Sequence, residues 1–297
     1  MRHYKKSFAE KIFDFLIVLF AVLLICVTLY PLVYTYSMAI SDPIHAARGE
    51  VWLFPKGFSL MAIETVLTDD NVMTYYYNTL WYTIVGTITG IITTSLAAYP
   101  LSRPEFRYGP VIMKLITFTM FFGGGLIPTY LVITKYLGLY NSRLAIILPS
   151  LTSAWYIIVS RNFFASLPGD IIESARIDGA SEYRIFLQLV MPLSKPILGV
   201  LALYYATGHW NAWFAHMLYL GKKNLHPLAL YIRSVVLQTQ LGAMNEKVPS
   251  SMNPEALLST MQIKYAVIVI SVTPMLCIYP FLSKNLEKGL MIGAVKG

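Results

Sequence analysis

Long apolar runs dominate the chain, and short segments between them hold most of the charges. A helix of roughly 20 apolar residues crosses the ~30 Å hydrocarbon layer of a membrane. Runs of about this length occupy residues 12–39, 73–101, 110–134, 143–164, 197–219 and 264–284. They are continuous rather than alternating, which favours helices over a β-barrel. The pattern therefore predicts an all-α membrane protein with six transmembrane helices.

Composition and charge support this prediction and orient it. The 297 residues are 56% hydrophobic and only 13% charged, and the net charge of +8 is scattered between apolar runs without the basic patch typical of nucleic-acid binding. With six spans, the two chain ends and every second connecting segment lie on one side of the membrane and hold 14 lysine and arginine residues. The segments on the other side hold 8, and Lys264 lies at a span boundary. The positive-inside rule then places both termini in the cytoplasm. We expect a cytoplasmic N-terminus (1–11), a membrane domain (12–284) and a cytoplasmic tail (285–297).

Several other classes of protein are disfavoured. The first apolar run is longer than the 7–15 residues of a signal-peptide core and lacks a small-residue cleavage site, so we interpret it as a retained helix. Cys26 and Cys277 lie far apart in apolar runs, which predicts neither a disulfide nor a metal site. No G-x-S-x-G motif or supported His metal site is present. We therefore expect no catalytic residue, metal or cofactor in this chain.

The segment 170–192 is charged and rich in small residues, unlike the apolar runs on either side. Asp170 is placed to cap a helix, with Glu173 reaching back to the cap. Gly179 can end that helix, and Ser181 can begin a second one that ends at Pro192. The pattern predicts a helix, a turn and a helix projecting into the cytoplasm.

The first helix of this hairpin has two distinct faces. Glu173 and Arg176 are three residues apart and can pair, whereas Ile172, Ala175 and Gly179 form a low-profile face that permits close approach of another surface. From the residues alone, the hairpin is either a docking element for a soluble partner, an amphipathic hairpin at the lipid headgroups, or a solvated connection.

The hairpin resembles the signature of permease subunits of ABC importers. The matching residues are Glu173, Ala175, Asp178, Gly179, Ala180, Phe186, Pro192, Leu193 and Pro196. Ser174 stands where the signature usually has alanine, and Pro100 stands where relatives commonly have a small residue. "LAAYPLSR" at 96–103 and "KGLMIGAVKG" at 288–297 resemble the carbohydrate-uptake branch, and the tail and "NEKVPSS" resemble its LplC/YtcP-like multiple-sugar or polysaccharide permeases.

This resemblance implies the type I ABC importer permease fold and a role in ATP-driven carbohydrate import across the bacterial cytoplasmic membrane. The hairpin would be the coupling helix, docking on an ATPase subunit through Glu173, Ser174, Ala175, Arg176, Asp178, Gly179 and Ala180. The chain lacks the G-x-x-x-x-G-K-[ST] motif, so ATP would be hydrolysed elsewhere. The implied partners are a second permease subunit, two ATPase subunits, an extracellular solute-binding protein and membrane lipid, with the tail facing the ATPases. A passive channel or a sensor subunit is the alternative function, but neither needs the hairpin.

A polar solute needs polar groups within the spans, which otherwise exclude them. The candidates for the substrate path are Asn78, His209, Asn211 and Trp213, and His209 and His216 are spaced to share a helix face. Such Asn and His residues also commonly join helices by hydrogen bonds, and the tyrosines around Asn78 are typical of an interfacial aromatic belt. Gly123–Gly125 indicates a hinge or a close-packing site, and Asn253 with Pro254 indicates a helix start in an outer loop.

Overall fold

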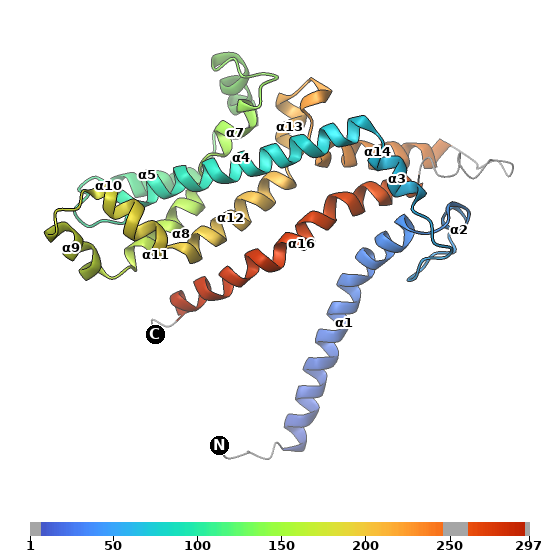
Figure 1. Ribbon diagram of the computed structural model, residues 1–297, viewed down its shortest axis with the longest axis horizontal. Coiled ribbons are helices and arrows are strands. Elements are labelled where there is room, and N and C mark those ends of the chain that lie inside the picture. Colours follow the sequence, from blue (N-terminus) through green and yellow to red (C-terminus); the bar gives the residue numbers. More distant parts are fainter. Residues whose placement is uncertain (1–6, 246–260, 295–297) are drawn as a thin grey trace. The chain divides into compact units, whose positions relative to one another are not determined.

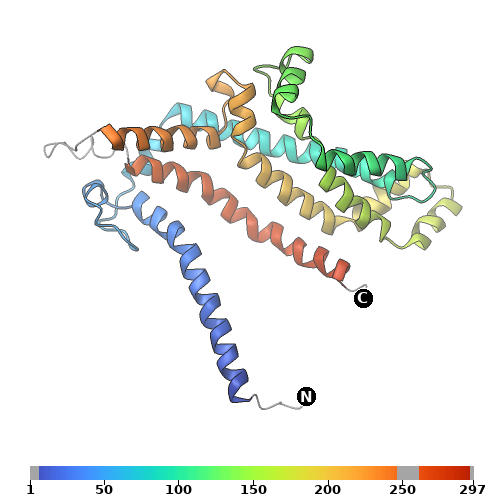
Figure 2. The same ribbon diagram turned by 180° about the vertical axis from the view of Figure 1, so that it is seen from behind.

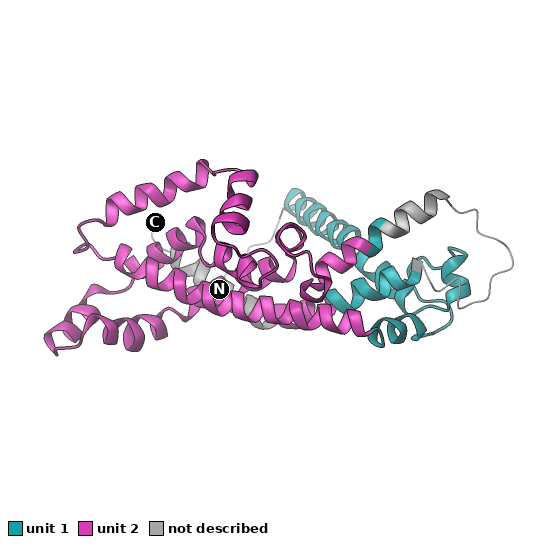
Figure 3. Cartoon of the chain, turned by 90° about the horizontal axis from the view of Figure 1, so that it is seen from above, with its two compact units in different colours: residues 1–69, 235–272 teal, residues 70–234, 273–297 magenta. Residues whose placement is uncertain are grey.

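The computed structural model describes residues 7–245 and 261–294. Within these ranges the regular structure is helical, apart from one isolated antiparallel bridge between Ser41 and Phe58. The chain forms two compact units, residues 1–69 with 235–272 and residues 70–234 with 273–297 (Figure 3). One division lies between residues 69 and 70, and the other two fall inside helices α14 (Leu228–Asn245) and α16 (Met261–Ala294). The all-α prediction is confirmed. The expected helix start at Asn253 lies outside the described residues.

The first unit contains α1 (Phe8–Ala39), α2 (Pro43–Ala47) and α3 (Met61–Leu67). The most apolar 18-residue stretch of α1 has a mean hydropathy of 3.0 and no buried residue in the single chain. A helix that is apolar on every side belongs in lipid or against another chain. At its end, Met38 packs with Ala46 and Val51, and the Gln262 side-chain amide donates to the carbonyls of Met38 and Ser41 at 3.1 and 2.5 Å.

The second unit holds the hairpin and the helices around it (Figures 1 and 2). Figures 1 and 2 show the hairpin at the end of this unit where α4 stops and α5 begins. Besides parts of α14 and α16, the second unit contains α4 (Asp70–Leu101), α5 (Gly109–Phe121), α6 (Leu126–Leu131), η1 (Val132–Tyr136), α7 (Leu144–Ser150), α8 (Ala154–Ala165), α9 (Gly169–Ile177), α10 (Glu182–Ile185), η2 (Phe186–Val190), α11 (Met191–Leu193), α12 (Lys195–Trp210), α13 (Phe214–Tyr219) and η3 (Lys223–Leu225).

Most of the predicted spans appear as helices or broken helices. Phe8–Ala39, Asp70–Leu101 and Gln262–Pro280 are each long and apolar enough to cross a membrane. The third and fourth spans are pairs of helices bent by 112° and 46°. A third bent pair consists of Glu182–Leu193 and Lys195–Trp210. If each bent pair counts as one span, the described residues contain up to six spans.

The prediction of a continuous fifth span over 197–219 is wrong. α12 ends at Trp210 and α13 begins only at Phe214. α12 is instead joined to the preceding segment Glu182–Leu193 by a bend of 79°. Pro196 lies in the first turn of α12, where its missing amide hydrogen would interrupt a helix continuing from α11.

The glycine triplet Gly123–Gly125 lies at the 112° bend between α5 and α6. Gly125 has a φ of +85°, and a Cβ atom at Gly123 or Gly124 would contact nothing within 4 Å in the described part of the chain. The triplet therefore forms a bend and is not a close-packing site against any described residue of this chain.

Close packing occurs instead between α4 and α12. A Cβ atom at Gly86 would overlap Nε2 of His209, and one at Gly90 would lie 2.6 Å from Cε1 of Tyr205. The two glycines, four residues apart, thus form a notch in α4 that receives two rings of α12. The Tyr205 hydroxyl also lies 2.6 Å from the hydroxyl of Thr94, which is fully buried.

Candidate functional site

The hairpin begins at α9, directly after Pro168. Pro168 occupies the N-cap position, and no side chain caps the helix. The prediction that Asp170 is the cap is therefore wrong by two residues. Asp170 lies in the first turn, where its charge is still favourable to the helix dipole.

The turn of the hairpin forms as predicted. Gly179 has a φ of +78°, and the amides of Gly179 and Ala180 donate to the carbonyls of Arg176 and Ala175, both at 3.0 Å. This is the Schellman arrangement, which ends a helix at a left-handed residue. Ser181 then caps α10, since its hydroxyl accepts from the amide of Arg184 at 3.4 Å. The second helix continues through η2 to Leu193, one residue beyond the predicted end.

The low-profile face of α9 packs on the chain itself. Ile172 is only 4% exposed and belongs to a buried cluster that includes Tyr99 of α4, Phe164 of α8 and Phe186 of η2. Ala175 and Ala180 are half-buried against the same cluster. The expectation that Ile172 and Ala175 present an open face is wrong, because α4, α8 and η2 already occupy it.

The opposite side of the hairpin is exposed. Glu173, Ser174, Asp178 and Gly179 all lie there, so four of the seven predicted docking residues share an accessible surface. Ile177 also lies there and was not among the residues predicted from the sequence; its side chain is 80% exposed immediately before the turn. The available signal was a large apolar residue next to an Asp-Gly turn in a charged segment.

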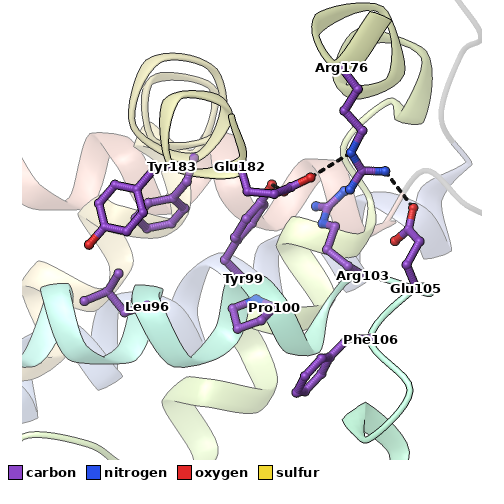
Figure 4. Close-up of a pocket in the computed structure, with 10 residues that line it drawn as sticks. Leu96, Tyr99, Pro100, Arg103, Glu105, Phe106, Arg176, Glu182 and Tyr183 are labelled. Atoms are coloured by element: carbon purple, nitrogen blue, oxygen red, sulfur yellow. Dashed lines mark hydrogen bonds and ion pairs between the residues drawn. The ribbon is translucent and has the colours of Figure 1, made fainter. Parts of the chain in front are cut away.

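Arg176 points away from this surface and toward the end of α4 (Figure 4). Its Nε donates to Oε1 of Glu182, and its Nη1 donates to Oε1 of Glu105, both at 2.8 Å. The predicted pair with Glu173 is therefore wrong. The Arg176 hydrogen bond holds the pKa of Glu105 below its ordinary value, and the two carboxylates raise the pKa of Arg176.

This network continues into the core. The Tyr99 hydroxyl donates to Oε2 of Glu182 at 3.1 Å, and the Arg103 guanidinium lies over the Tyr99 ring at 5.0 Å. Arg103 also donates to the carbonyl of Phe164 at 2.7 Å. A cavity of about 410 Å³ adjoins the network and is lined by Leu96, Tyr99, Pro100, Arg103, Glu105, Phe106, Arg176, Glu182, Tyr183 and Phe186 (Figure 4).

Asn78, a candidate for the substrate path, is 1% exposed. Its amide nitrogen donates to the carbonyls of Asn224 and His226 at 2.7 and 3.1 Å, and its oxygen accepts from Arg143 at 2.9 Å. These bonds connect α4 to the segment around η3 and to the start of α7. All three therefore hold the chain's own fold together.

His209, another candidate, lines a second cavity of about 340 Å³. The cavity is formed by α7, α8, α12 and α13, and the aromatic rings of Tyr156, Tyr204 and Tyr205 line it too. The rings of Tyr156 and Tyr204 stack at 5.8 Å. These tyrosines were missed, because their convergence depends on how α8 packs against α12.

The remaining candidates lie apart from this cavity lining. Asn211 is exposed at the end of α12 and donates to the carbonyl of Thr207 at 2.9 Å. The Trp213 ring lies 3.7 Å from the Arg233 guanidinium carbon. His216 is fully buried on α13, so the expected shared face of His209 and His216 is wrong, since the break at 211–213 puts them on separate helices.

The described residues contain no group of three or more His, Cys, Asp or Glu side chains placed to hold a metal ion. Cys26 and Cys277 are both free and exposed. The described parts of the site therefore offer an exposed surface on the hairpin, the ion-pair network of Arg176 and two cavities.

The candidate spans define a multi-pass membrane protein. A scan against models of known protein families finds no match. The chain is 36% identical over 290 residues to Protein LplC of Bacillus subtilis (strain 168), covering 97% of this chain and 96% of that protein. It is 34% identical to the polygalacturonan/rhamnogalacturonan transport system permease protein YtcP of the same organism, covering 97% and 99%.

A solved structure supports the same assignment. A chain of a bacterial ABC transporter involved in the import of the acidic polysaccharide alginate matches with a TM-score of 0.85 and 32% identity, covering 95% of this chain and 99% of that one. The chain belongs to the permease subunits of carbohydrate ABC importers. Its function is that of a permease in ATP-driven carbohydrate import, and its fold is that of an ABC importer permease.

Proposed function

We propose that this chain is one of two different permease subunits in a bacterial cytoplasmic membrane, with both termini in the cytoplasm. Two cytoplasmic ATPase subunits hydrolyse ATP, and an extracellular solute-binding protein delivers the carbohydrate. The excess of cations in segments that include both ends supports this orientation, and the absence of a phosphate-binding loop motif supports separate ATPase subunits.

The hairpin docks on an ATPase subunit through its exposed side. The observation that carries this proposal is Ile177, which is 80% exposed although the opposite face of the same hairpin is packed into the core. Covering an isoleucine side chain contributes about 1.5–3 kcal/mol, so an uncovered one at a projecting turn favours a protein partner. Glu173, Ser174, Asp178 and Gly179 surround it with polar groups and a small residue. Arg176, Ala175 and Ala180 support this surface from the inner side.

Co-purification of the ATPase subunits with the permease tests the docking. Ile177→Asp should reduce recovery of the ATPase at least tenfold, because a carboxylate would have to be buried in the contact. Ser166→Asp adds the same charge at an exposed position just before the hairpin and should have little effect. Full ATPase recovery with folded Ile177→Asp would refute the docking surface.

The carbohydrate path includes the cavity between α8 and α12. Tyrosine rings and polar groups lining one cavity suit a sugar, which offers both apolar ring faces and hydroxyls. His209 lines this cavity, and Asn211 and Trp213 lie at the following break in the helices. Asn78 acts in support of the path, because its amide is engaged within the chain.

The carried substrate is a fragment of a polysaccharide. YtcP is named for polygalacturonan and rhamnogalacturonan, and the related solved transporter is involved in alginate import. Uptake into proteoliposomes holding the full transporter would test this with labelled oligosaccharides from pectin and alginate. Tyr204→Leu should slow uptake without reducing ATPase recovery. Tyr136 is an exposed tyrosine at the end of η1, and Tyr136→Leu should leave uptake unchanged. Uptake of neither class by the unaltered transporter would refute this substrate assignment.

A further inference from the structure

Arg176 differs from the other predicted docking residues because its side chain joins two other elements to its own helix. It belongs to α9, Glu182 opens α10, and Glu105 lies in the connection between α4 and α5. One guanidinium group therefore joins the two arms of the hairpin and ties both to the scaffold (Figure 4). The rest of the described hairpin contains no second ion pair to the scaffold.

The geometry suits positioning more than stabilisation. The side chains of Arg176, Glu105 and Glu182 are 35%, 58% and 57% exposed, and ion pairs this open to solvent contribute little to stability. A guanidinium group is planar, and its donors have fixed directions, so its two bonds to two carboxylates fix an angle as well as a distance. A lysine ammonium has no such fixed fork.

Behind Glu182, this contact reaches buried packing. Glu182 accepts from the hydroxyl of Tyr99, which is 8% exposed within the cluster that joins α4, α8 and η2. Arg103 stacks on the same tyrosine and bonds the last turn of α8 through the Phe164 carbonyl. A change in the angle of α9 is thus passed through Glu182 to the ends of two helices.

We infer that Arg176 is a positioning residue, which sets the orientation of the hairpin relative to the end of α4 without itself touching the ATPase. This inference rests on the proposed function only in taking the hairpin as the docking element. The chain offers a matched comparison in Arg184 on α10. Among the described residues, its guanidinium group bonds only Gln188 on the following turn, with Nε donating to Oε1 at 2.9 Å.

The test measures the distance between a spin label on the hairpin and one on the scaffold. Cys26 and Cys277 are first replaced by serine, and labels are attached through Ile177→Cys on α9 and Arg107→Cys in the α4–α5 connection, both exposed positions. The purified permease, together with its partner permease subunit and without ATPase subunits, is measured in lipid nanodiscs by double electron–electron resonance. With Arg176, Glu105 and Glu182 unaltered, the two labels should give one narrow distance distribution.

Arg176→Gln should at least double the width of that distribution, and Arg176→Lys should broaden it as well, because one ammonium cannot hold both carboxylates in the fork. Arg184→Gln removes the same charge from the same hairpin and should leave the width unchanged. Glu105→Gln should broaden the distribution in part, and adding it to Arg176→Gln should cause no further broadening, because both changes break one link.

A narrow, unshifted distribution in folded Arg176→Gln would overturn the inference, and so would equal broadening in Arg184→Gln. Loss of ATPase recovery by Arg176→Gln without broadening would make Arg176 a docking contact and would also overturn it. Should Arg176→Gln fail to fold, Glu105→Gln, at an exposed position, decides the question by the same width. The docking proposal is tested separately by co-purification. It would fail if the ATPase subunits did not co-purify with the unaltered permease.

Discussion

Replacing Gly90 by alanine tests the packing of α4 against α12, which holds Tyr205 of the second cavity in place. The new Cβ atom would lie 2.6, 2.7 and 2.8 Å from Cε1, Cζ and Cδ1 of Tyr205. These distances are too short for carbon atoms, and the ring is not the free end of a flexible chain. Its hydroxyl is held by Thr94 at 2.6 Å and by the Leu151 carbonyl at 3.2 Å. The ring must therefore move and weaken both bonds.

The expected cost combines three contributions. Overpacking of a core costs about 1–3 kcal/mol. Two weakened hydrogen bonds within a membrane cost about 0.6–2 kcal/mol each. Replacing glycine by alanine within a helix returns about 1 kcal/mol. The net loss is about 1–6 kcal/mol, which at roughly 2 °C per kcal/mol corresponds to a fall in Tm of about 2–12 °C for a chain of this size.

Thermal stability in detergent, followed by the monodisperse fraction on size-exclusion chromatography, measures this loss. Gly208→Ala is the matched control, because Gly208 lies within α12 and its added Cβ would meet nothing within 4 Å. It should leave the Tm unchanged or raise it slightly. Tyr205→Ala removes the ring, so Gly90→Ala should cost nothing more in that background. A Tm of Gly90→Ala equal to the parent value, or an equal fall for Gly208→Ala, would refute the proposed packing.

Three further substitutions have defined outcomes. Gly179→Ala should destabilise the hairpin by about 1–2 kcal/mol, because its φ of +78° is left-handed, whereas Gly179→Asn should cost less; faster amide exchange in α9 measures both. Asn78→Leu should lower the free energy of unfolding by about 2–3 kcal/mol, measured by thermal unfolding, because it leaves buried partners unbonded. Folding lowers the pKa of Glu105, so the ionised carboxylate contributes fully to folding stability above its unfolded pKa of about 4.3. This contribution is lost as the pH falls through the lowered pKa of the folded state. The difference in Tm between the parent and Glu105→Gln should therefore be constant from about pH 8 to 5 and shrink in acid.

Local signals in the sequence were sufficient for the elements of the hairpin. Gly179 and Ser181 act within a few residues of themselves, through a turn and a cap, so their roles could be predicted without knowing the fold. Hydrophobic run length likewise predicted the first, second and sixth spans. The prediction of Asp170 as the N-cap of α9 was wrong because Pro168 occupies that position. A sequence pattern alone does not rank two possible caps.

Contacts between distant segments could not be predicted in this way. Arg176 was paired with Glu173 because the two lie three residues apart, yet it bonds Glu105, 71 residues away. Asn78 bonds the carbonyl of Asn224, 146 residues away, and no periodicity in the sequence indicates that contact. The same limit explains why Tyr156 and Tyr204 were missed, since their stacking requires α8 and α12 to be placed first.

Helix α4 connects the proposed docking hairpin to the proposed carbohydrate path. Tyr99 in its last two turns bonds Glu182 of the hairpin, and Thr94 bonds Tyr205, which lines the cavity of the path. The two contacts are five residues apart, about 7.5 Å along a helix. A helix is stiff over so short a length, so the end of α4 cannot rotate without moving Thr94. On the proposed docking, movement of the ATPase therefore reaches the ring of Tyr205 through a single helix, with no intervening loop to absorb it.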